Sequence, residues 1–378
     1  MAVLGLLVSG PPMQALAAIY TWNGTSSSWS SSTSWTPSGP PGASDTAVFG
    51  LSSGSGSLFL GGDQLIGNLT FSSGAGAFTF DTLMAANLLT LGDNGLIWDQ
   101  SGTLGLETIN DSIVIGPTSG IFQSDSNLGL VFANSVSGSA LSGTTSLNLS
   151  GISGGVGTIS GLIGDGTGGG NLAINASGAG TWTLSDAANS YTGGTTISGG
   201  TLSISALGDL GLGGGVVISN NATLGTTTSF ANSQAMTLGA AGTYGVGGGT
   251  LDVALGTVET ITSPITGTGG LIKVDGGNLT LAAANTYLGL TQVKAGNLVL
   301  SSSPAATSST SATLGVSQYL GYQGLYNTGT LILANGYSGF TLSSSILVTG
   351  GSSSSFTEAA ILSTGNNTIN GNIMFAGG

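Results

Sequence analysis

Short runs in which apolar and polar residues alternate follow one another along most of this chain. The alternation puts Leu202 and Ile204 on one face of a strand and Ser203 on the other. No stretch shows a sustained 3.6-residue period, so the pattern predicts an all-β fold with essentially no helix. Examples of such runs, each bounded by Gly, Asn or Asp, are NLTF at 68–71, SIVIG at 112–116, SLNLSG at 146–151 and TLSIS at 201–205.

One longer phrase occurs twice, since residues 180–204 align with residues 277–300 after one deletion. The alignment keeps the apolar position of each strand, the glycine of each turn and an Asn-x-Tyr corner. One such unit has about three short strands and cannot bury its apolar face alone, so stacking of neighbouring units is expected. The shared positions include Asn189 with Asn285, Tyr191 with Tyr287, Gly193 with Gly289, Thr195 with Thr291, and Leu202 with Leu298.

Lead-in segments of one type precede both copies, which places repeat units near 159–204 and 263–300. Short strands, Gly or Asn turns and no helix fit a parallel β-solenoid with turns of roughly 20 to 25 residues, and we predict this fold for residues 51–378. A series of β-sandwiches is the alternative, because strands at this spacing also suit sandwiches. The tail at 361–378 looks like a lead-in without its phrase, so we expect a fragment truncated at its C-terminus.

Two segments precede the predicted solenoid. Residues 1–18 contain an apolar stretch and a small-residue Ala-Leu-Ala site, as at the end of a secretory signal peptide, although no basic residue precedes them; a buried first strand is the alternative. Residues 19–50 are rich in Trp and Pro. We predict that they form a cap over the first turn that blocks edge-to-edge pairing. The alternative is that Trp22, Trp29 and Trp35 are exposed on one face, where they would form a platform on which sugar rings stack.

Charged residues make up only 4% of the chain, whereas 40% of its residues are hydrophobic. Disordered chains combine low hydrophobicity with high charge, so disorder is disfavoured. Fifteen acids against two bases give a formal net charge of −13, which excludes nucleic-acid binding through a basic patch. With no Cys and no His, disulfides, thiolate metal sites and triads with a His base are excluded as well.

Hydrolysis of polysaccharides is the enzymatic alternative, and it needs two carboxylates close in space. Residues one turn apart meet in a solenoid, so acids at the right spacing become candidates. Solvated turn acids are the simpler interpretation of the same residues. The candidate pairs are Glu107 with Asp125 and Asp252 with Asp275, and the candidate bases are Lys273 and Lys294.

Two further patterns are expected to be structural. The glycines of GDGTGGG, at 164–170, match the dinucleotide-binding fingerprint by letter, but no helix is predicted after them, so we predict a turn and no cofactor. Asparagines at glycine-bounded turns, such as Asn68 and Asn221, are expected to stack their amides on asparagines of the next turn. The sequence therefore assigns no catalytic, cofactor-binding or metal-binding residue.

The phrase GTWTLSDAANSYTGGTTISGGTLSI, at 180–204, resembles the autotransporter-associated β-strand repeat. The resemblance is most specific in the Asn-x-Tyr-x-Gly-x-Thr core. The second copy departs from the pattern at Leu288 and Leu290, where small or polar residues are usual. The Trp-rich opening is also similar to the start often found in such repeat proteins.

The resemblance implies a right-handed β-helix in the passenger of a large protein, secreted or displayed on the outer membrane of a Gram-negative-type bacterium. It brings no catalytic residues with it. Such proteins can carry a membrane-embedded β-barrel or another anchor at the C-terminus, which would lie beyond Gly378. We therefore expect a non-enzymatic spacer, surface layer or adhesin stalk. A carbohydrate-binding adhesin is the alternative, and extracellular polysaccharide or surface proteins are the expected partners.

Overall fold

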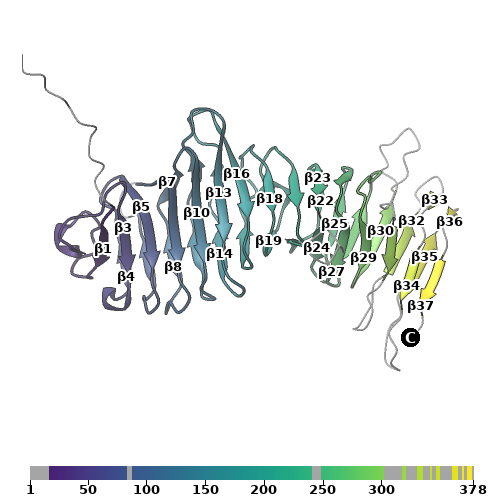
Figure 1. Ribbon diagram of the computed structural model, residues 1–378, viewed down its shortest axis with the longest axis horizontal. Coiled ribbons are helices and arrows are strands. Elements are labelled where there is room, and N and C mark those ends of the chain that lie inside the picture. The colour runs from purple at the N-terminus through teal and green to yellow at the C-terminus, as the bar shows by residue number, and fades with distance from the viewer. Residues whose placement is uncertain are drawn as a thin grey trace, which may run out of the picture.

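The strands of this protein stack along one axis into a rod (Figure 1). The computed structural model describes residues 17–82, 87–240 and 248–301, and seven further strands between 317 and 376. The predicted signal segment therefore lies outside the described residues except for its last two. The helical elements of the described residues are three short 3-10 turns, namely η1 (Ser32–Ser34), η2 (Leu51–Ser53) and η3 (Leu207–Leu210).

A 15-stranded sheet runs along the first two-thirds of the described chain, and its strands are parallel except for the pair β1 and β2. Its main path is β2 (Trp35–Thr36), β1 (Ile19–Trp22), β3 (Thr46–Phe49), β5 (Gln64–Phe71), β7 (Leu88–Asp99), β10 (Ser119–Ser124), β13 (Thr144–Ser150), β16 (Asn171–Ala176), β18 (Thr195–Ile197), β20 (Val216–Ile218), β23 (Met236–Leu238) and β26 (Ile265–Gly267). Through β7 it continues into β9 (Ser112–Ile115), β12 (Val136–Gly138) and β15 (Ile163–Gly164).

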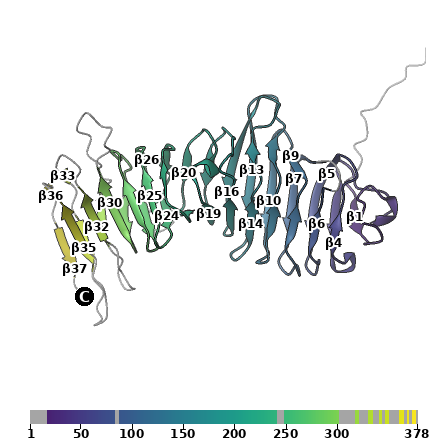
Figure 2. The same ribbon diagram turned by 180° about the vertical axis from the view of Figure 1, so that it is seen from behind.

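A 14-stranded parallel sheet covers another side of the rod and reaches its far end (Figure 2). Its strands are β4 (Gly56–Leu58), β6 (Phe78–Phe80), β8 (Glu107–Ile109), β11 (Leu130–Phe132), β14 (Val156–Ile159), β17 (Thr181–Leu184), β19 (Thr201–Ile204), β21 (Thr223–Thr226), β24 (Gly249–Val253), β27 (Leu271–Val274), β29 (Leu290–Val293), β31 (Ser317–Leu320), β34 (Ile346–Thr349) and β37 (Ile373–Ala376).

The later turns add a third face. It is a six-stranded sheet of β22 (Phe230–Asn232), β25 (Val258–Ile261), β28 (Asn278–Leu281), β30 (Asn297–Ser301), β32 (Thr330–Ala334) and β35 (Ala360–Thr364), beside the pair β33 (Thr341–Leu342) and β36 (Thr368–Ile369). Neighbouring strands of this face are parallel and come from successive turns. The prediction of an all-β parallel solenoid is therefore confirmed, and the sandwich alternative is wrong.

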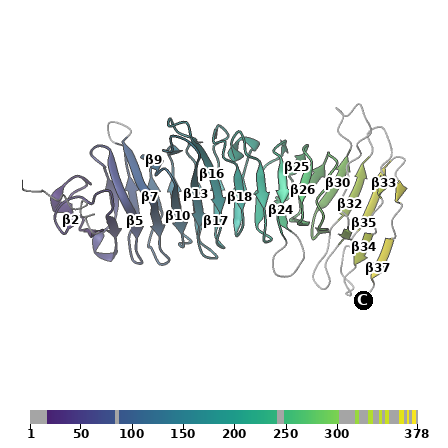
Figure 3. The same cartoon turned by 45° about the horizontal axis from the view of Figure 1, so that its top comes forward.

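The length of a turn varies more than the sequence predicts. Thr181 pairs with Thr201, which lies 20 residues later, whereas Thr79 pairs with Thr108, which lies 29 residues later. Between turns the strands stay in line along the rod, so the additional residues lie in the loops that join strands (Figure 3). Stacking fixes the positions of the strands, whereas the number of residues in a loop can vary because loops lie at the surface.

Inward side chains stack into columns that run along the rod. The predicted inward residues Leu202 and Ile204 are buried, while Ser203 between them is partly exposed. In the 14-stranded sheet one column passes through Trp182, Leu202 and Leu224, each paired with its neighbour one turn away. Burying each such leucine contributes about 1.5 to 3 kcal/mol, and only the neighbouring turns provide the cover.

Bulky residues in a column are matched by small ones on the next turn. The ring of Trp182 fills the space beside Gly157, where an added Cβ would lie 2.5 Å from the ring. Phe122 and Phe132 stack with ring centroids 3.9 Å apart, and Trp182 lies 6.4 Å from each ring. The glycine therefore makes room for an aromatic cluster that fills the middle of the rod.

Close approach of the backbone between turns predicts which glycines cannot be replaced. At Gly161 a Cβ would overlap the backbone carbonyl of Asn134 on the neighbouring turn, whereas at Gly225 the nearest atom would lie 3.7 Å away. We expect Gly161→Ala to lower the free energy of unfolding by about 3 kcal/mol.

Gly225→Ala is the matched control, since that residue lies in a strand with an ordinary backbone, and we expect a change of less than about 1 kcal/mol. The measurement is the guanidinium midpoint of the purified chain. Equal midpoints for the two variants would contradict the packing described for Gly161.

Candidate functional site: the repeat corner, the acids and the N-terminal pocket

The Asn-x-Tyr corner of the first repeat copy links three successive turns. The Ile163 N–H donates to Asn189 Oδ1 at 2.7 Å, and Asn189 Nδ2 donates to the Asp209 carbonyl oxygen at 3.0 Å. Ile163 precedes Asn189 by 26 residues and Asp209 follows it by 20, so the two bonds reach the turns on both sides. The Tyr191 hydroxyl shares a hydrogen bond with Thr195 Oγ1 at 2.7 Å. The polar groups of this buried corner are therefore used to hold turns together.

The second copy repeats two of these contacts, although Asn285 Nδ2 donates to the Ala283 carbonyl oxygen two residues before it. The Ile265 N–H donates to Asn285 Oδ1 at 2.9 Å, and the Tyr287 hydroxyl shares a hydrogen bond with Thr291 Oγ1 at 2.5 Å. Both Tyr191 and Tyr287 are fully buried. The repeated phrase thus encodes one local structure, in which the asparagine accepts an amide from the turn before it.

The structure does not bring together the first candidate pair of carboxylates. Leu130, and not Asp125, lies one turn from Glu107, so the predicted stacking of these two acids is wrong. Asp125 accepts hydrogen bonds from Trp98 Nε1 and, on the next turn, from the Ile152 N–H. The register differs from the prediction because turn length varies, which shifts the partner of any residue by several positions.

The second candidate pair lies on neighbouring turns one position out of register, since Asp252 pairs with Val274 and Asp275 follows it. Lys273, one of the candidate bases, lies in the same strand as Val274. Burial raises the pKa of Asp252, the neighbouring Asp275 raises it further, and the charge of Lys273 lowers it. Lys273 is fully buried, and its Nζ donates to the carbonyl oxygens of Val274 at 2.6 Å and Asp275 at 2.8 Å. Burial lowers the pKa of Lys273 to about 8, against the pull of the nearby carboxylates.

Of these three residues, Lys273 lies inside the solenoid, whereas Asp252 is partly exposed and Asp275 is exposed. Lys273 takes the position of an inward apolar residue, between Leu251 on one turn and Val293 on the next. Glu259, which also interacts with Lys273, is fully buried on another face, and burial raises its pKa to about 7. A polysaccharide could not contact Lys273 or Glu259 while the rod is folded. Lys294 lies on the next turn, where its N–H donates to the Lys273 carbonyl.

Acids nearer the surface accept backbone N–H groups from the neighbouring turn. Hydrogen bonds to an ionised acceptor are the stronger kind, so each of these acids stabilises the contact between two turns. Aspartates of this kind are Asp63 with the Leu88 N–H, Asp93 with the Thr118 N–H, Asp125 with the Ile152 N–H and Asp165 with the Thr192 N–H, at 2.8 to 3.0 Å.

Asparagine ladders occur, but not at the first position predicted. Asn68 donates to Thr46 Oγ1 on one neighbouring turn and accepts from the Leu96 N–H on the other, so it pairs with no asparagine in these two contacts. Asn175 Nδ2 donates to Asn148 Oδ1 at 3.3 Å, which is an amide contact of the predicted kind. Asn221 lies at a turn with φ of 61°.

The glycines of GDGTGGG form a turn, as predicted. Gly166 and Gly169 have positive φ, and the next element is the strand β16 and not a helix. Among the described residues, no group of three or more Asp, Glu, His or Cys side chains could hold a metal ion.

The three tryptophans of the opening segment are buried and do not form an exposed platform. Trp29 and Trp35 pack edge to face with ring centroids 4.8 Å apart, Trp22 packs on Trp35 at 5.0 Å, and all three rings surround Phe49. The backbone N–H of Trp29 donates to the Phe59 carbonyl oxygen, so this segment also covers the edge of the 14-stranded sheet. This packing is that of a plug on the first turn.

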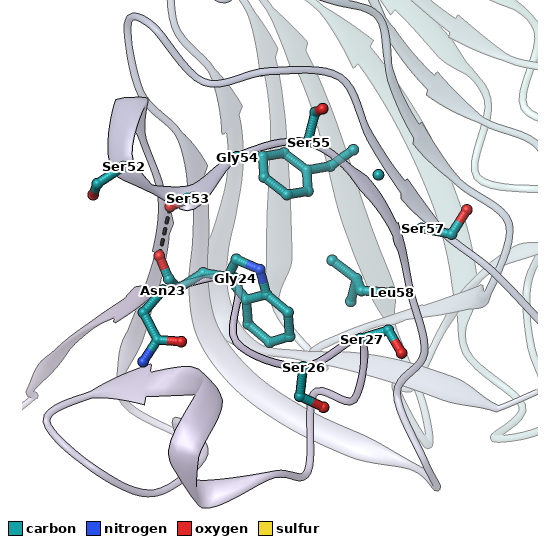
Figure 4. Close-up of a pocket in the computed structure, with 13 residues that line it drawn as sticks. Asn23, Gly24, Ser26, Ser27, Ser52, Ser53, Gly54, Ser55, Ser57 and Leu58 are labelled. Carbon is teal, nitrogen blue, oxygen red and sulfur yellow. Dashed lines mark hydrogen bonds between the residues drawn. The ribbon is translucent and has the colours of Figure 1, made fainter.

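A pocket of about 370 Å³ opens beside this plug (Figure 4). Its mouth is formed by two serine-rich loops, with Asn23, Gly24, Ser26 and Ser27 on one side and residues 52–57 on the other. Trp22, Leu58 and Phe78 line its floor, and no charged side chain lines it. In a chain of net charge −13, this pocket offers neutral hydroxyl groups over an apolar base.

Known proteins are similar to this chain in the segments that carry the corners. The passenger-associated-transport-repeat family model matches residues 174–204 and 271–300. Two segments of the chain are thus similar to this transport repeat. The BmaC autotransporter adhesin of Brucella suis biovar 1 is 31% identical over 253 residues, which is 60% of this chain and 7% of that protein. The chain thus spans less than a tenth of the length of this relative. No solved structure matches it.

The resemblance to an autotransporter-type β-strand repeat is therefore confirmed. The repeat matches coincide with the two structural corners, at Asn189 and Asn285. Within the described part of the chain, no helix has the length and apolar character needed to cross a membrane.

The buried carboxylates were not predicted from the sequence, although the alternation of apolar and polar residues places them on the inward face. Asp99 is two residues from the inward Ile97, and Glu107 is two residues from the inward Ile109. Glu259 likewise lies two residues before the inward Ile261. A charged residue in phase with the apolar positions of a strand therefore predicts a buried charge here.

The repeat corner gives a direct test. Asn189→Ala leaves the Ile163 N–H and the Asp209 carbonyl without their partner, so we expect a loss of about 2 to 4 kcal/mol in the free energy of unfolding. Asn175→Ala, on the partly exposed face of β16, is the matched control with an expected loss of less than about 1 kcal/mol.

Amide hydrogen exchange gives a local measurement of the same change. In the Asn189→Ala variant, exchange should become faster at Ile163, on the turn before the corner. Unchanged protection at Ile163 would show that the bond between the turns contributes nothing.

Proposed function

We propose that this chain belongs to a non-enzymatic passenger on the surface of a Gram-negative-type bacterium, where its solenoid serves as the stalk of an adhesin. The main support is the pair of passenger-associated transport repeats, each folded into a corner that links turns. Similarity to an autotransporter adhesin over 60% of the chain supports the same assignment.

The rod has the physical properties that a stalk needs. Each turn adds parallel strands to the sheets, so length grows with the number of turns while the cross-section stays the same. Apolar side chains point inward and Thr or Ser points outward, as Thr181 and Thr183 do beside Trp182 and Leu184. The outer face of such strands is thus polar although the chain has very few charges, and with no Cys the stack is held without disulfides.

The positions of the acids favour the non-enzymatic role over the polysaccharide-acting enzyme. The candidate base Lys273 is fully buried, and Asp125 accepts hydrogen bonds that hold two turns together. Glycoside hydrolysis needs one carboxyl group that protonates the leaving group and one that attacks or activates water, both in contact with substrate. Glu107 is buried and does not pair with Asp125, and although Asp252 and Asp275 reach the surface, the lysine beside them, Lys273, is buried.

The N-terminal pocket is the part of the described surface best suited to contact a glycan. Ser27, Ser52, Ser55 and Ser57 are exposed around its mouth, and they offer hydroxyl donors and acceptors without charge. Uncharged sugars are bound through hydrogen bonds over an apolar base, which Trp22 and the other floor residues supply. We therefore propose that the ligand of the adhesin, where it is a polysaccharide, is neutral.

Adhesion is tested with beads coated with the purified chain, incubated with cultured animal cells and with a panel of neutral oligosaccharides. We expect the coated beads to bind to the cells or to the immobilised oligosaccharides. The Ser57→Tyr substitution fills the pocket, and we expect it to reduce the number of bound beads about tenfold. Ser203→Tyr, on the outer face of β19 in the middle of the rod, is the matched control and should not change retention.

The possible results separate the proposals. Retention that Ser57→Tyr does not affect keeps the adhesin role and removes the pocket from it. Coated beads that bind neither cells nor sugars would leave only a spacer role. Release of reducing sugar ends from a polysaccharide by the purified chain would overturn the non-enzymatic assignment.

A further inference from the structure

One part of the solenoid contains three inward-facing carboxyl groups in a short stretch of chain. Asp99 ends β7, Glu107 begins β8, and Asp111 lies between β8 and β9. Their exposed fractions are 0%, 0% and 1%. Glu107 pairs with Leu130 on the next turn, and Asp99 lies between Phe71 and Ser124 of its two neighbouring turns. No other stretch of this length in the described residues has so many buried acids.

These carboxyl groups lack the partners that buried carboxylates require. Glu107 accepts one bond, from the Phe78 N–H at 2.9 Å, and Asp99 accepts a long one from Ser124 Oγ at 3.4 Å. One oxygen of Asp99, one of Glu107 and both of Asp111 have no hydrogen-bond partner. An ionised carboxylate in such a place is costly, whereas the protonated form is tolerated.

The charges that face the three groups make ionisation still less favourable. Asp99 faces Asp125 and Glu107, and Glu107 faces Asp99. No lysine is near, because Lys273 and Lys294 lie several turns away along the rod. The hydroxyl groups of Thr103 and Ser124 near Asp99 and the Phe78 N–H at Glu107 lower these pKa values only in part.

The third group follows the same rule. Burial, with a smaller effect of Asp81, raises the pKa of Asp111 to about 6. Burial, the largest cause, raises the pKa of Asp99 to about 7 and that of Glu107 to about 8. All three values lie well above those of the free side chains.

We propose that the turn formed by β7, β8 and β9 is a pH-sensitive joint of the rod, tightly packed when Asp99, Glu107 and Asp111 are protonated and locally opened more often when they ionise. In a solenoid each turn contacts only its neighbours, so the effect of three charges stays local. The rod would thus be stiffest in mildly acidic surroundings and would loosen at this one place as the pH rises. This property is independent of the adhesin assignment.

The direction follows from proton binding. The folded-state pKa of each group is raised above its unfolded value, so the folded turn binds protons that the unfolded chain releases. The stability contributed by these protons is complete below the unfolded pKa near 4, and it is lost as the pH rises toward about 8. Ordinary salt-bridged acids have the opposite dependence.

The test is hydrogen exchange of the purified chain at pH 5 and pH 8 and constant ionic strength, expressed as protection factors that correct for the intrinsic rate. Between these values we expect protection of the amides in 88–115 to fall by about 100-fold, because a single group with the shift of Glu107 already supplies such a factor. Amides of β16 to β19, where no acid of this kind is buried in a strand, should change much less.

Neutral isosteres identify the groups responsible. In the triple variant Asp99→Asn, Glu107→Gln and Asp111→Asn we expect the protection of 88–115 to become independent of pH. The matched control is Glu259→Gln, a buried acid on β25, which should change the pH dependence around 258–261 and leave that of 88–115 intact.

The wild-type chain alone can overturn the proposal. Protection factors in 88–115 that are equal at pH 5 and pH 8 would do so, whether or not the triple variant folds. A triple variant that folds and keeps the full pH dependence would equally exclude these three residues as its source.

Discussion

Each turn of this rod can bury its apolar face only against the turns on either side of it. Strand β19, for example, has four residues, two of them inward, and its ladder bonds run only to β17 and β21. Stability therefore comes from repetition, and a residue matters through what it does for the next turn. Both Gly161 and Asn189 hold neighbouring turns together. Gly161 allows close approach of two backbones, and Asn189 forms hydrogen bonds to the turns on both sides.

The same constraint explains where the few charged residues lie. Outward acids such as Asp93 and Asp165 accept amides from the adjacent turn, so their charge is satisfied by the stack itself. Inward acids such as Glu107 replace an apolar residue in a column, and they weaken the stack when ionised. In this chain with 4% charged residues, an outward acid therefore stabilises the contact between turns, whereas an ionised inward acid weakens it.

The fold could be predicted from the sequence because alternation and repetition act over short distances. The inward positions of Leu202 and Ile204 follow from parity, and the corner around Asn189 follows from its second copy. The true partner of Glu107, Leu130, could not be predicted, because that needs the length of every intervening loop and the separation of paired residues ranges from 19 to 33. The pocket likewise depends on how the opening segment folds back over the first turn.

The two repeat copies lie on different faces of the rod, and this limits what the repeat can do. Strands β17, β18 and β19 of the first copy belong to the 14-stranded, 15-stranded and 14-stranded sheets, whereas β28, β29 and β30 of the second belong to the six-stranded, 14-stranded and six-stranded sheets. Equivalent side chains therefore do not line up along one side, and the repeats cannot present a continuous binding stripe. The proposed pocket beside the N-terminal plug, by contrast, lies where the regular stack of turns ends.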